Sequence, residues 1–225
     1  MKNLRLHKKQ RLQKGMKRAF DIMVALTMVL MVSWIYFLVY IYHRFMLRAK
    51  SRLFFIQPRV GKDNKIFNCI KFQTMNNYGK NYETNDRIIK YELFLRKYRI
   101  DELPQFFNVL KGDMSIVGPR PLIQREIEEY SEKIYNTTDR HLMKPGMTGL
   151  SQITVSELNG KNEALVTRKI NQDVWYCYNW SFMLDLLIFF KTPFFVISRK
   201  QINLSGLRLP QTQTTYTYTA SAAAS

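Results

Sequence analysis

Cysteine is nearly absent from this chain, which has only Cys69 and Cys177 among its 225 residues. No Cys-x-x-Cys pair or Cys/His cluster exists, so the sequence disfavours a zinc site, and two distant cysteines make no disulfide framework. We therefore expect a reducing, cytosolic setting for the folded part of the chain. The Walker phosphate-loop pattern, HExxH and GxSxG are also missing, which argues against zinc proteases and serine hydrolases.

Acidic residues are the second scarcity. The chain has 17 Asp and Glu against 35 Lys and Arg, a formal net charge of +18. Such an excess indicates an anionic partner: nucleic acid, an anionic membrane surface or a phosphorylated substrate. Because basic residues cluster beside an apolar segment and no nucleic-acid-binding motif is present, we expect a membrane and a phosphorylated substrate, and no nucleic acid.

Charge is missing altogether from residues 22–42, IMVALTMVLMVSWIYFLVYIY. As a helix this run would reach roughly 31 Å, about the thickness of a hydrocarbon core. The run is too long for a signal peptide, and no small-residue cleavage site follows it. Eight Lys or Arg lie within residues 1–18, and four more basic residues follow the run within 44–52. The sequence therefore predicts a membrane segment with basic flanks on both sides.

Two topologies are compatible with these flanks. A single-pass anchor is the simpler interpretation of the residues alone, but it exports one basic flank against the positive-inside tendency. A re-entrant helix returns both flanks to one side of the membrane. Ser33 lies near the middle of the run, where its hydroxyl can bond the carbonyl four residues back and bend the helix.

The region after the membrane segment alternates between strand and helix patterns. Leu53–Gln57 and Lys65–Phe72 read as two strands of a β-hairpin, joined by a turn over 60–64. A helical pattern follows from Asp86, and a second helix is expected to begin with Asp101 as its N-cap and to end at Gly112. Between the hairpin and these helices, we expect a polar loop over 76–86. After them, we expect an extended segment over 113–121, a Glu-rich helix over 122–135 and a loop over 145–149. An apolar helix over 182–198, at an interface or in the core, and an irregular polar tail over 209–225 complete the chain.

Asp101 and Glu102 form the first candidate site. A helix start favours ionised carboxylates, and Arg96 and Arg99 nearby act in the same direction. An ionised Asp can attack phosphorus, and adjacent carboxylates suit Mg²⁺, which prefers a few protein oxygens together with phosphate oxygens. For an isolated Asp-Glu-Leu-Pro segment, ordinary helix capping is the alternative.

Three basic groups are candidates for phosphate binding. Arg120 lies between Pro119 and Pro121, which fix the backbone and pre-order a guanidinium that binds phosphate oxygens as a fork. Lys71, at a strand edge, could sit beside a phosphate. Lys144 opens a glycine-containing loop able to bring backbone N–H groups near an anion. Two of these groups have a plainer alternative. Arg120 could be an exposed arginine of a turn or part of a proline ligand for a partner domain, and Lys71 could be a solvated lysine.

Taken together, the segments resemble the bacterial sugar transferases, also called monotopic phosphoglycosyl transferases, and in particular their short, minimal members. The matching segments are KRAFD (17–21), IFNCIKFQTM (66–75), DELPQFFNVLKGDMSIVGPRPL (101–122), KPGMTGLSQI (144–153) and DVWYCYNWSFMLDLLIFFKT (173–192). They occur in the family's order, and the central block is highly specific. The sequence departs from the family at Trp34, where a proline is usual, at Gln73, at Lys144 and around 159–162.

The resemblance implies an α+β, mostly helical fold. It implies a basic segment (1–18), a re-entrant membrane helix (19–50), a cytosolic catalytic domain with a small β-hairpin and interfacial amphipathic helices (51–200), and a tail (201–225). It places the protein at the bacterial cytoplasmic membrane with the domain facing the cytoplasm.

The resemblance also implies a reaction. Asp101 corresponds to the family nucleophile, Glu102 completes its dyad with Mg²⁺, and Arg96 and Arg120 match its phosphate-binding arginines. The implied donor is a UDP-sugar and the acceptor is undecaprenyl phosphate. Asp101 attacks the sugar-bearing phosphorus, UMP leaves, and the lipid phosphate takes the phospho-sugar, the first membrane step of a surface glycan or glycoprotein glycan. Direct transfer without a covalent enzyme and a non-catalytic membrane anchor are the rivals, and a homodimer stays open.

Overall fold

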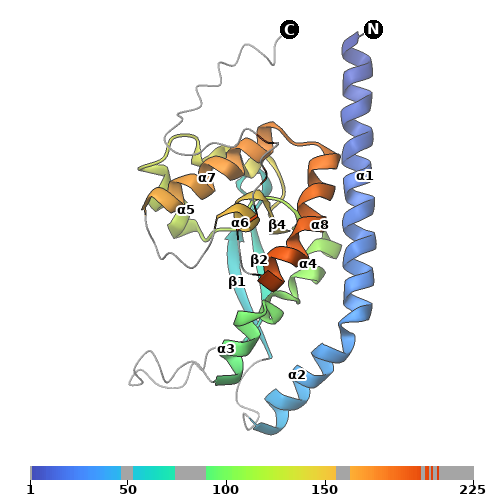
Figure 1. Ribbon diagram of the computed structural model, residues 1–225, viewed down its shortest axis with the longest axis vertical. Coiled ribbons are helices and arrows are strands. Elements are labelled where there is room, and N and C mark those ends of the chain that lie inside the picture. Colours follow the sequence, from blue (N-terminus) through green and yellow to red (C-terminus); the bar gives the residue numbers. More distant parts are fainter. Residues whose placement is uncertain are drawn as a thin grey trace.

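A long helix runs along one side of the molecule, and a mixed domain packs beside it (Figure 1). The computed structural model describes residues 2–46, 53–73, 90–155 and 163–198, together with 201, 202, 204 and 207. The long helix is α1 (Lys2–Met31), and after a bend the chain continues as α2 (Ser33–Met46). The domain consists of β1 (Phe54–Val60), the 3₁₀ turn η1 (Lys62–Asn64), β2 (Ile66–Phe72), α3 (Lys90–Lys97), the 3₁₀ turn η2 (Ile100–Glu102), α4 (Gln105–Lys111), β3 (Ser115–Val117), α5 (Gln124–Ser131), the 3₁₀ segment η3 (Thr137–Leu142), β4 (Gly146–Thr148), α6 (Leu150–Thr154), α7 (Glu163–Tyr178) and α8 (Phe182–Ser198).

The predicted β-hairpin is confirmed. β1 and β2 pair antiparallel, with Phe55 opposite Lys71 and Val60 opposite Ile66. β1 continues past its predicted end at Gln57, because a two-stranded ribbon has open edges where Pro58 needs no hydrogen-bond partner for its missing N–H. The mostly helical fold with a small antiparallel hairpin therefore agrees with the prediction.

The start of the central helix differs from the prediction. Arg99 adopts a left-handed conformation (φ 55°), which ends the preceding helical segment and opens the tight turn η2. Asp101 and Glu102 lie in this turn, and the N-cap of α4 is Pro104. Asp101 is therefore not the cap of α4: the candidate dyad lies in a tight 3₁₀ turn that directly precedes the helix.

The end of α4 is where the sequence placed it. Gly112 has φ 97°, a left-handed conformation that suits glycine at a helix C-terminus. Arg18 of α1 completes this end, because its Nη1 donates to Val109 O at 2.7 Å and its Nη2 donates to Leu110 O at 2.8 Å. The long helix thus binds the last carbonyl groups of α4 through one guanidinium.

The predicted loop over 145–149 contains a short strand. β4 pairs in parallel with β3, with Ser115 opposite Gly146. Two glycines allow this contact, since a Cβ on Gly146 would lie 2.1 Å from Gly118 N and one on Gly118 would lie 2.3 Å from Lys144 O. The two glycine-containing motifs therefore lie backbone against backbone.

Two further predicted helices are confirmed, one of them with different bounds. The Glu-rich helix α5 is shorter than the predicted 122–135, and the apolar helix over 182–198 is a single helix, α8. The polar loop over 76–86, residues 159–162 and the tail from 209 lie outside the described residues.

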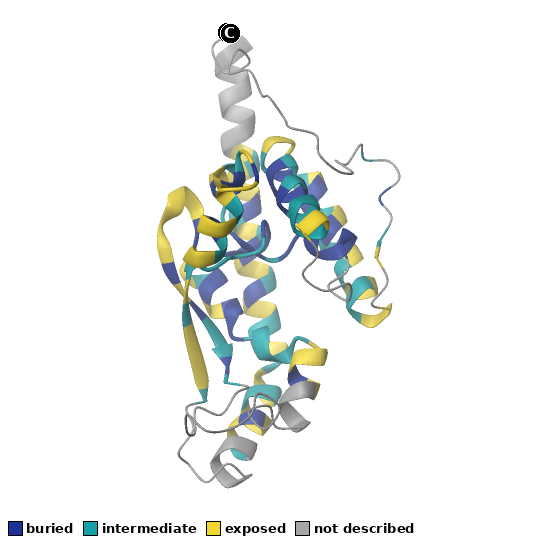
Figure 2. Cartoon of the chain, turned by 90° about the vertical axis from the view of Figure 1, so that its left-hand side faces the viewer, coloured by how far each residue is buried: buried dark blue, intermediate teal, exposed yellow. Residues whose placement is uncertain are grey.

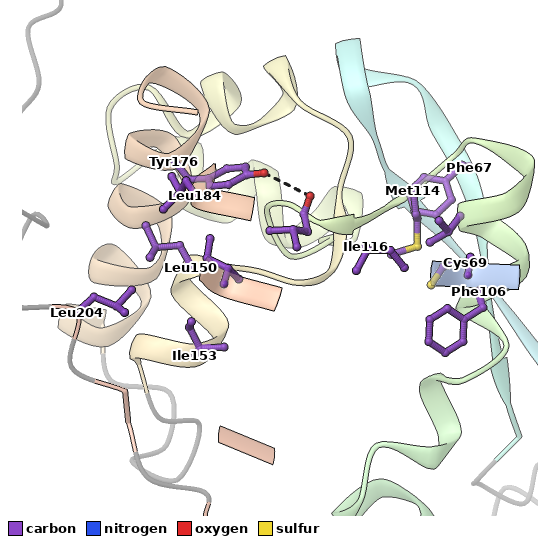
Figure 3. Close-up of a cluster of buried hydrophobic side chains, with 14 residues drawn as sticks. Phe67, Cys69, Phe106, Met114, Ile116, Leu150, Ile153, Tyr176, Leu184 and Leu204 are labelled. Atoms are coloured by element: carbon purple, nitrogen blue, oxygen red, sulfur yellow. Dashed lines mark hydrogen bonds between the residues drawn. The ribbon is translucent and has the colours of Figure 1, made fainter. Parts of the chain in front are cut away.

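The main core lies between α1, the hairpin and the C-terminal helices. Phe67, Cys69, Phe106 and Met114 pack at the hairpin side, while Leu150, Ile153, Tyr176 and Leu184 pack at the helical side (Figure 3). The Tyr176 hydroxyl donates to Val117 O at 3.3 Å between the two groups. Along α1 the buried residues Lys17, Asp21 and Ala25 recur every four positions and therefore share one face of the helix. Buried positions gather in the interior of the molecule, and exposed positions are common at its margins (Figure 2).

The bend between α1 and α2 falls at the middle of the apolar run. By length and composition no single helix in the described part of the chain qualifies as a membrane span, whereas the pair Leu12–Met31 and Ser33–Ile41, bent by 47°, does so together. The Ser33 hydroxyl donates to Leu30 O at 2.8 Å, three residues back rather than four. Whether the pair re-enters the membrane stays a prediction at this point.

Candidate functional site

A small polar cleft lies where the hairpin meets η2, the segment after β3 and the turn from β4 into α6. Its lining includes three of the residues that the sequence singled out for chemistry, Lys71, Glu102 and Arg120. The complete lining is Arg59, Cys69, Lys71, Glu102, Gln105, Arg120, Pro121, Gly146, Met147 and Gln152. Segments far apart in the sequence thus converge on one site.

Glu102 is the electrostatic centre of the cleft. Lys71 Nζ lies 3.1 Å from Glu102 Oε1, and Arg99 Nη1 lies 3.5 Å from Glu102 Oε2. Burial raises the pKa of the Glu102 carboxyl, but Arg120, Lys71 and Arg99 outweigh it and lower the pKa to about 2. Glu102 is therefore ionised at every physiological pH and holds the surrounding cations in place.

Asp101 lies beside the cleft and behaves differently. Burial and the neighbouring Glu102 carboxylate raise its pKa, while Lys71 and Arg96 oppose this shift. Arg96 does lower the pKa of Asp101, as the sequence suggests, but burial and the adjacent negative charge outweigh it. A less stabilised carboxylate is a more basic oxygen nucleophile than its neighbour.

Arg120 is held from behind by a buried ion pair. Arg140 Nη2 donates to Arg120 O at 2.6 Å and pairs with Asp173 Oδ2 at 2.5 Å. The Ser151 hydroxyl donates to Asp173 Oδ1 at 2.6 Å. This network connects the Pro-Arg-Pro segment to η3, α6 and α7, so the backbone that carries Arg120 is fixed by more than its two prolines.

The other predicted residues lie around the cleft or apart from it. Pro121 lines the cleft, whereas Pro119 is buried behind it and accepts the Gly146 N–H at 2.8 Å. That N–H is therefore not free for an anion, contrary to the expectation for this loop. Lys144 does not line the cleft: its Nζ lies 3.5 Å from the position of a Cβ on Gly112, close to Arg18.

Sequence reasoning missed several lining residues. Arg59 is the only charged residue of β1, and its guanidinium bonds Pro121 O at 3.0 Å and Gln57 Oε1 at 2.6 Å. A lone charge in an apolar strand could have indicated it. Gln105 and Gln152 had no such signal, because a glutamine in a short helix looks like any surface residue.

The carboxylates restrict how a metal could bind. No group of three or more His, Cys, Asp or Glu side chains lies together within the described ranges. Asp101 and Glu102 are two adjacent carboxylates, and both Glu102 oxygens already face cations. This set fits Mg²⁺ only in its usual substrate-bridging mode, with one or two protein oxygens, phosphate oxygens and water.

The KRAFD motif fastens α1 to the same part of the domain. Lys17 Nζ pairs with Asp185 Oδ2 at 2.7 Å and donates to Val117 O at 2.8 Å. Asp21 Oδ1 accepts from the Ser115 hydroxyl and from Ile116 N, each at 2.9 Å. α1 is thereby bound to β3, which leads directly into the segment that carries Arg120.

Comparison with known proteins identifies the family of the chain. A family model described as bacterial sugar transferase matches residues 12–199. The chain belongs to the bacterial sugar transferase family, as the motifs predicted.

Three relatives illustrate the range of the family. A sugar transferase of Bacillus subtilis, EpsL, is 41% identical over 177 residues, which are 77% of this chain and 83% of that protein. Undecaprenyl-phosphate galactose phosphotransferase of Salmonella typhimurium is 34% identical over 212 residues, 84% of this chain and 42% of that protein. UDP-glucose:undecaprenyl-phosphate glucose-1-phosphate transferase of Klebsiella pneumoniae is 39% identical over 186 residues, 79% of this chain and 39% of that protein. The chain therefore spans about two fifths of the length of the Salmonella and Klebsiella relatives.

Proposed function

We propose that this protein transfers a sugar 1-phosphate from a UDP-sugar to undecaprenyl phosphate or a related polyprenyl phosphate, giving a polyprenyl diphosphate sugar and UMP. The observation that carries the proposal is that Glu102, Lys71 and Arg120 line one cleft and that Asp101 adjoins it in the same turn as Glu102. The names of the Salmonella and Klebsiella relatives supply the donor and acceptor classes.

In the first half-reaction a carboxylate oxygen of Asp101 attacks the phosphorus that bears the sugar. The bond between this phosphorus and the bridging oxygen breaks, and UMP leaves with the electron pair. In the second half-reaction a phosphate oxygen of the lipid attacks the same phosphorus, and the Asp101 carboxylate leaves. No proton has to be transferred to the enzyme in either half, since both leaving groups are stable anions.

The residues around Asp101 have separate tasks in this scheme. Lys71, Arg96 and Arg120 offset the charge of the diphosphate and of the phosphorus under attack. Glu102 holds Lys71 through their 3.1 Å ion pair, and it keeps negative charge beside Asp101, which makes that carboxylate more basic. Asp101 and Glu102 are the residues that would hold Mg²⁺, whose chemistry there would be charge neutralisation between the phosphates.

A membrane location is supported by an apolar outer surface. Exposed large hydrophobic side chains gather on the outer side of α1, α2 and α8 and at the start of β1. They are Leu26, Leu30, Met31, Trp34, Phe37, Leu38 and Tyr40 on α1 and α2, Phe54, Phe55 and Ile56 on β1, and Met183, Leu187, Phe190, Phe194 and Ile197 on α8. Such a surface suits a bilayer, in which the acceptor lipid is dissolved.

Contacts of the bent pair favour a re-entrant arrangement. Before the bend, Asp21 bonds the domain and Ala25 is fully buried against it. After the bend, the Tyr36 hydroxyl donates to Leu103 O at 2.9 Å, and Val39 is buried with Phe72. Both arms therefore touch the same domain, which a helix crossing the bilayer could do only if the domain lay on both sides. We infer that both basic flanks and the domain face the cytoplasm of the bacterial cytoplasmic membrane.

One assay tests the reaction and its closest rival. Purified protein is incubated with Mg²⁺ and a panel of UDP-sugars, with and without undecaprenyl phosphate, and UMP is measured. We expect sustained UMP formation with one or a few donors and the lipid, and a stoichiometric burst without the lipid. Direct transfer predicts no burst. A non-catalytic anchor predicts no UMP from any donor, which would overturn the proposed function.

A further inference from the structure

Unpaired polar atoms point to an additional substrate contact in the cleft. Within the described part of the chain, five buried side-chain nitrogens have no hydrogen-bond partner: Arg59 Nε, Arg140 Nη1, Gln152 Nε2, Arg168 Nε and Gln172 Nε2. Two of them, on Arg59 and Gln152, belong to residues that line the cleft. Buried donors are almost always satisfied in folded proteins, so this pair indicates acceptors that a ligand would bring.

Gln152 is the more informative of the two. It lies on the short helix α6, only 6% exposed, directly after the glycine-containing strand β4. A Cβ on Gly149 would lie 3.4 Å from Gln152 Nε2 and 2.1 Å from Gly118 O, so the glycine allows the backbone to pack closely beside the amide. A donor held at this depth without an acceptor destabilises the free protein.

Arg59 shows that this wall of the cleft is rigid. Its two terminal nitrogens bond Pro121 O and Gln57 Oε1, and Glu126 lies 3.5 Å away. Only Nε is left without a partner. The unpaired Arg59 Nε is thus held in place before any ligand arrives.

The charges in the cleft indicate which kind of ligand atom would accept from Gln152. Lys71, Arg59 and Arg120 line it and are opposed by the single carboxylate of Glu102. An anionic oxygen is therefore the acceptor that the surroundings favour for the Gln152 amide. We propose that Gln152 Nε2 donates a hydrogen bond to a phosphoryl oxygen of the diphosphate in the nucleotide-sugar donor. The identity of the diphosphate rests on the proposed function; the anion-binding role of Gln152 rests on the cleft itself.

The experiment measures binding rather than turnover. The full-length protein in lipid nanodiscs is titrated calorimetrically with UDP and, separately, with inorganic pyrophosphate, both with Mg²⁺. Gln152→Met keeps the side-chain length and removes the donor, and we expect it to weaken both ligands about tenfold or more. Gln152→Glu replaces the donor by a negative acceptor and should weaken both at least as much.

Gln172 supplies a matched control. It is fully buried and also has an unpaired Nε2, but it lies on α7 outside the cleft, and its Oε1 accepts from Thr154 at 2.6 Å. Gln172→Met should bind UDP and pyrophosphate within about twofold of the unmodified protein, whatever its effect on stability.

The outcomes separate the two proposals. If the dissociation constants of Gln152→Met stay within about twofold of those of the unmodified protein, the role of Gln152 is overturned. Retained binding by Gln152→Glu also overturns it, because the ligand would then donate a hydrogen bond instead of accepting one. Binding of pyrophosphate but not UDP, lost in Gln152→Met, supports the role of Gln152 and contradicts the nucleotide donor. Binding of neither ligand by the unmodified protein overturns both.

Discussion

Two adjacent carboxylates, Asp101 and Glu102, differ because of which atoms surround them. Lys71, Arg99 and Arg120 lower the pKa of Glu102 to about 2, while burial and Glu102 itself raise the pKa of Asp101. Environments that push the pKa values of neighbouring acids apart are typical of acids with separate roles. We therefore assign the nucleophile to Asp101 and the structural anion to Glu102.

The first prediction concerns Asp101→Asn, which should abolish UMP formation and yet raise the melting temperature at neutral pH. The folded state raises the pKa of Asp101 above its ordinary value of 3.8, so folding is favoured below that pH and weakened as the pH rises through the higher folded-state pKa. Asparagine removes the cost of the ionised form, and we expect a gain of about 1–3 °C at pH 7.5 that disappears near pH 3.

Asp63→Asn is the control for this prediction, because Asp63 is exposed at the tip of the hairpin and pairs with Lys62 only at 3.9 Å. It should change neither activity nor melting temperature. Near-normal turnover by a purified Asp101→Asn protein that is free of deamidation would contradict the nucleophile assignment.

The second prediction concerns the shape of the cation at position 120. Arg120→Lys keeps the charge but loses the planar fork that satisfies two phosphate oxygens, and we expect kcat/KM to fall about tenfold to a hundredfold. Arg125→Lys, on the exposed side of α5, is the matched control and should have no effect. Activity of Arg120→Lys within about threefold would mean that Arg120 is a simple counter-charge.

At the residue scale, sequence reasoning found Lys71, Glu102, Arg120 and Pro121 but missed Arg59 and the two glutamines of the cleft. Lys71, Glu102 and Arg120 were recognisable because charge at a strand edge, in a turn or between prolines suggests a ligand. Gln152 was not, since only its burial without a partner marks it. The raised pKa of Asp101 could not be predicted either, because its largest cause is burial, which the sequence does not show.

At the scale of elements, the break between α1 and α2 replaces a proline that the family usually has. Val32 N donates to Met28 O at 2.9 Å, while Ile35 N and Tyr36 N both donate to Val32 O. In the described chain no backbone hydrogen bond from Trp34 N crosses the break. The helix is therefore interrupted at the position where a proline would remove no hydrogen bond.

The third prediction follows from this geometry. Trp34→Pro should be tolerated, with activity retained and a melting temperature within about 2 °C, because proline fits the first turn of a helix. Phe37→Pro is the control: Phe37 is similarly exposed but lies one turn further into α2, where proline should lower the free energy of unfolding by about 3 kcal/mol or more. Equal damage by both substitutions, measured by thermal unfolding in nanodiscs, would show that α1 and α2 act as one continuous helix.

Elements with a strong local pattern were predictable, and those set by tertiary contacts were not. Alternation of apolar and polar residues is enough to indicate β1 and β2. The start of α4 depends on the left-handed Arg99, and β4 exists only because Gly146 and Gly118 bring two backbones together. Neither feature leaves a periodic signal in the sequence.

At the scale of the whole molecule, direct contacts connect α1 and α2 to the part of the domain that carries the candidate dyad. Lys17 and Asp21 bind α1 to β3 and α8, and Tyr36 of α2 bonds Leu103, the residue after the dyad. α1 runs beside the domain along much of its height (Figure 1). A rigid attachment of this kind keeps the cleft at a fixed distance from the apolar surface, which is where a lipid phosphate would be presented.

The last prediction is that both flanks of residues 22–42 face the cytoplasm. Basic charge lies on both sides of this run, and both arms of the bent pair contact one domain. Under the proposed function, the cleft of this domain would bind a cytosolic nucleotide sugar. Single cysteines at Lys9 and Lys50, in a protein lacking Cys69 and Cys177, are treated in intact cells with a membrane-impermeant reagent. Both should be protected until the membrane is opened, with UMP formation confirming that each variant is folded. Labelling of Lys9→Cys from outside would show a spanning helix, and it would leave the transferase reaction itself standing.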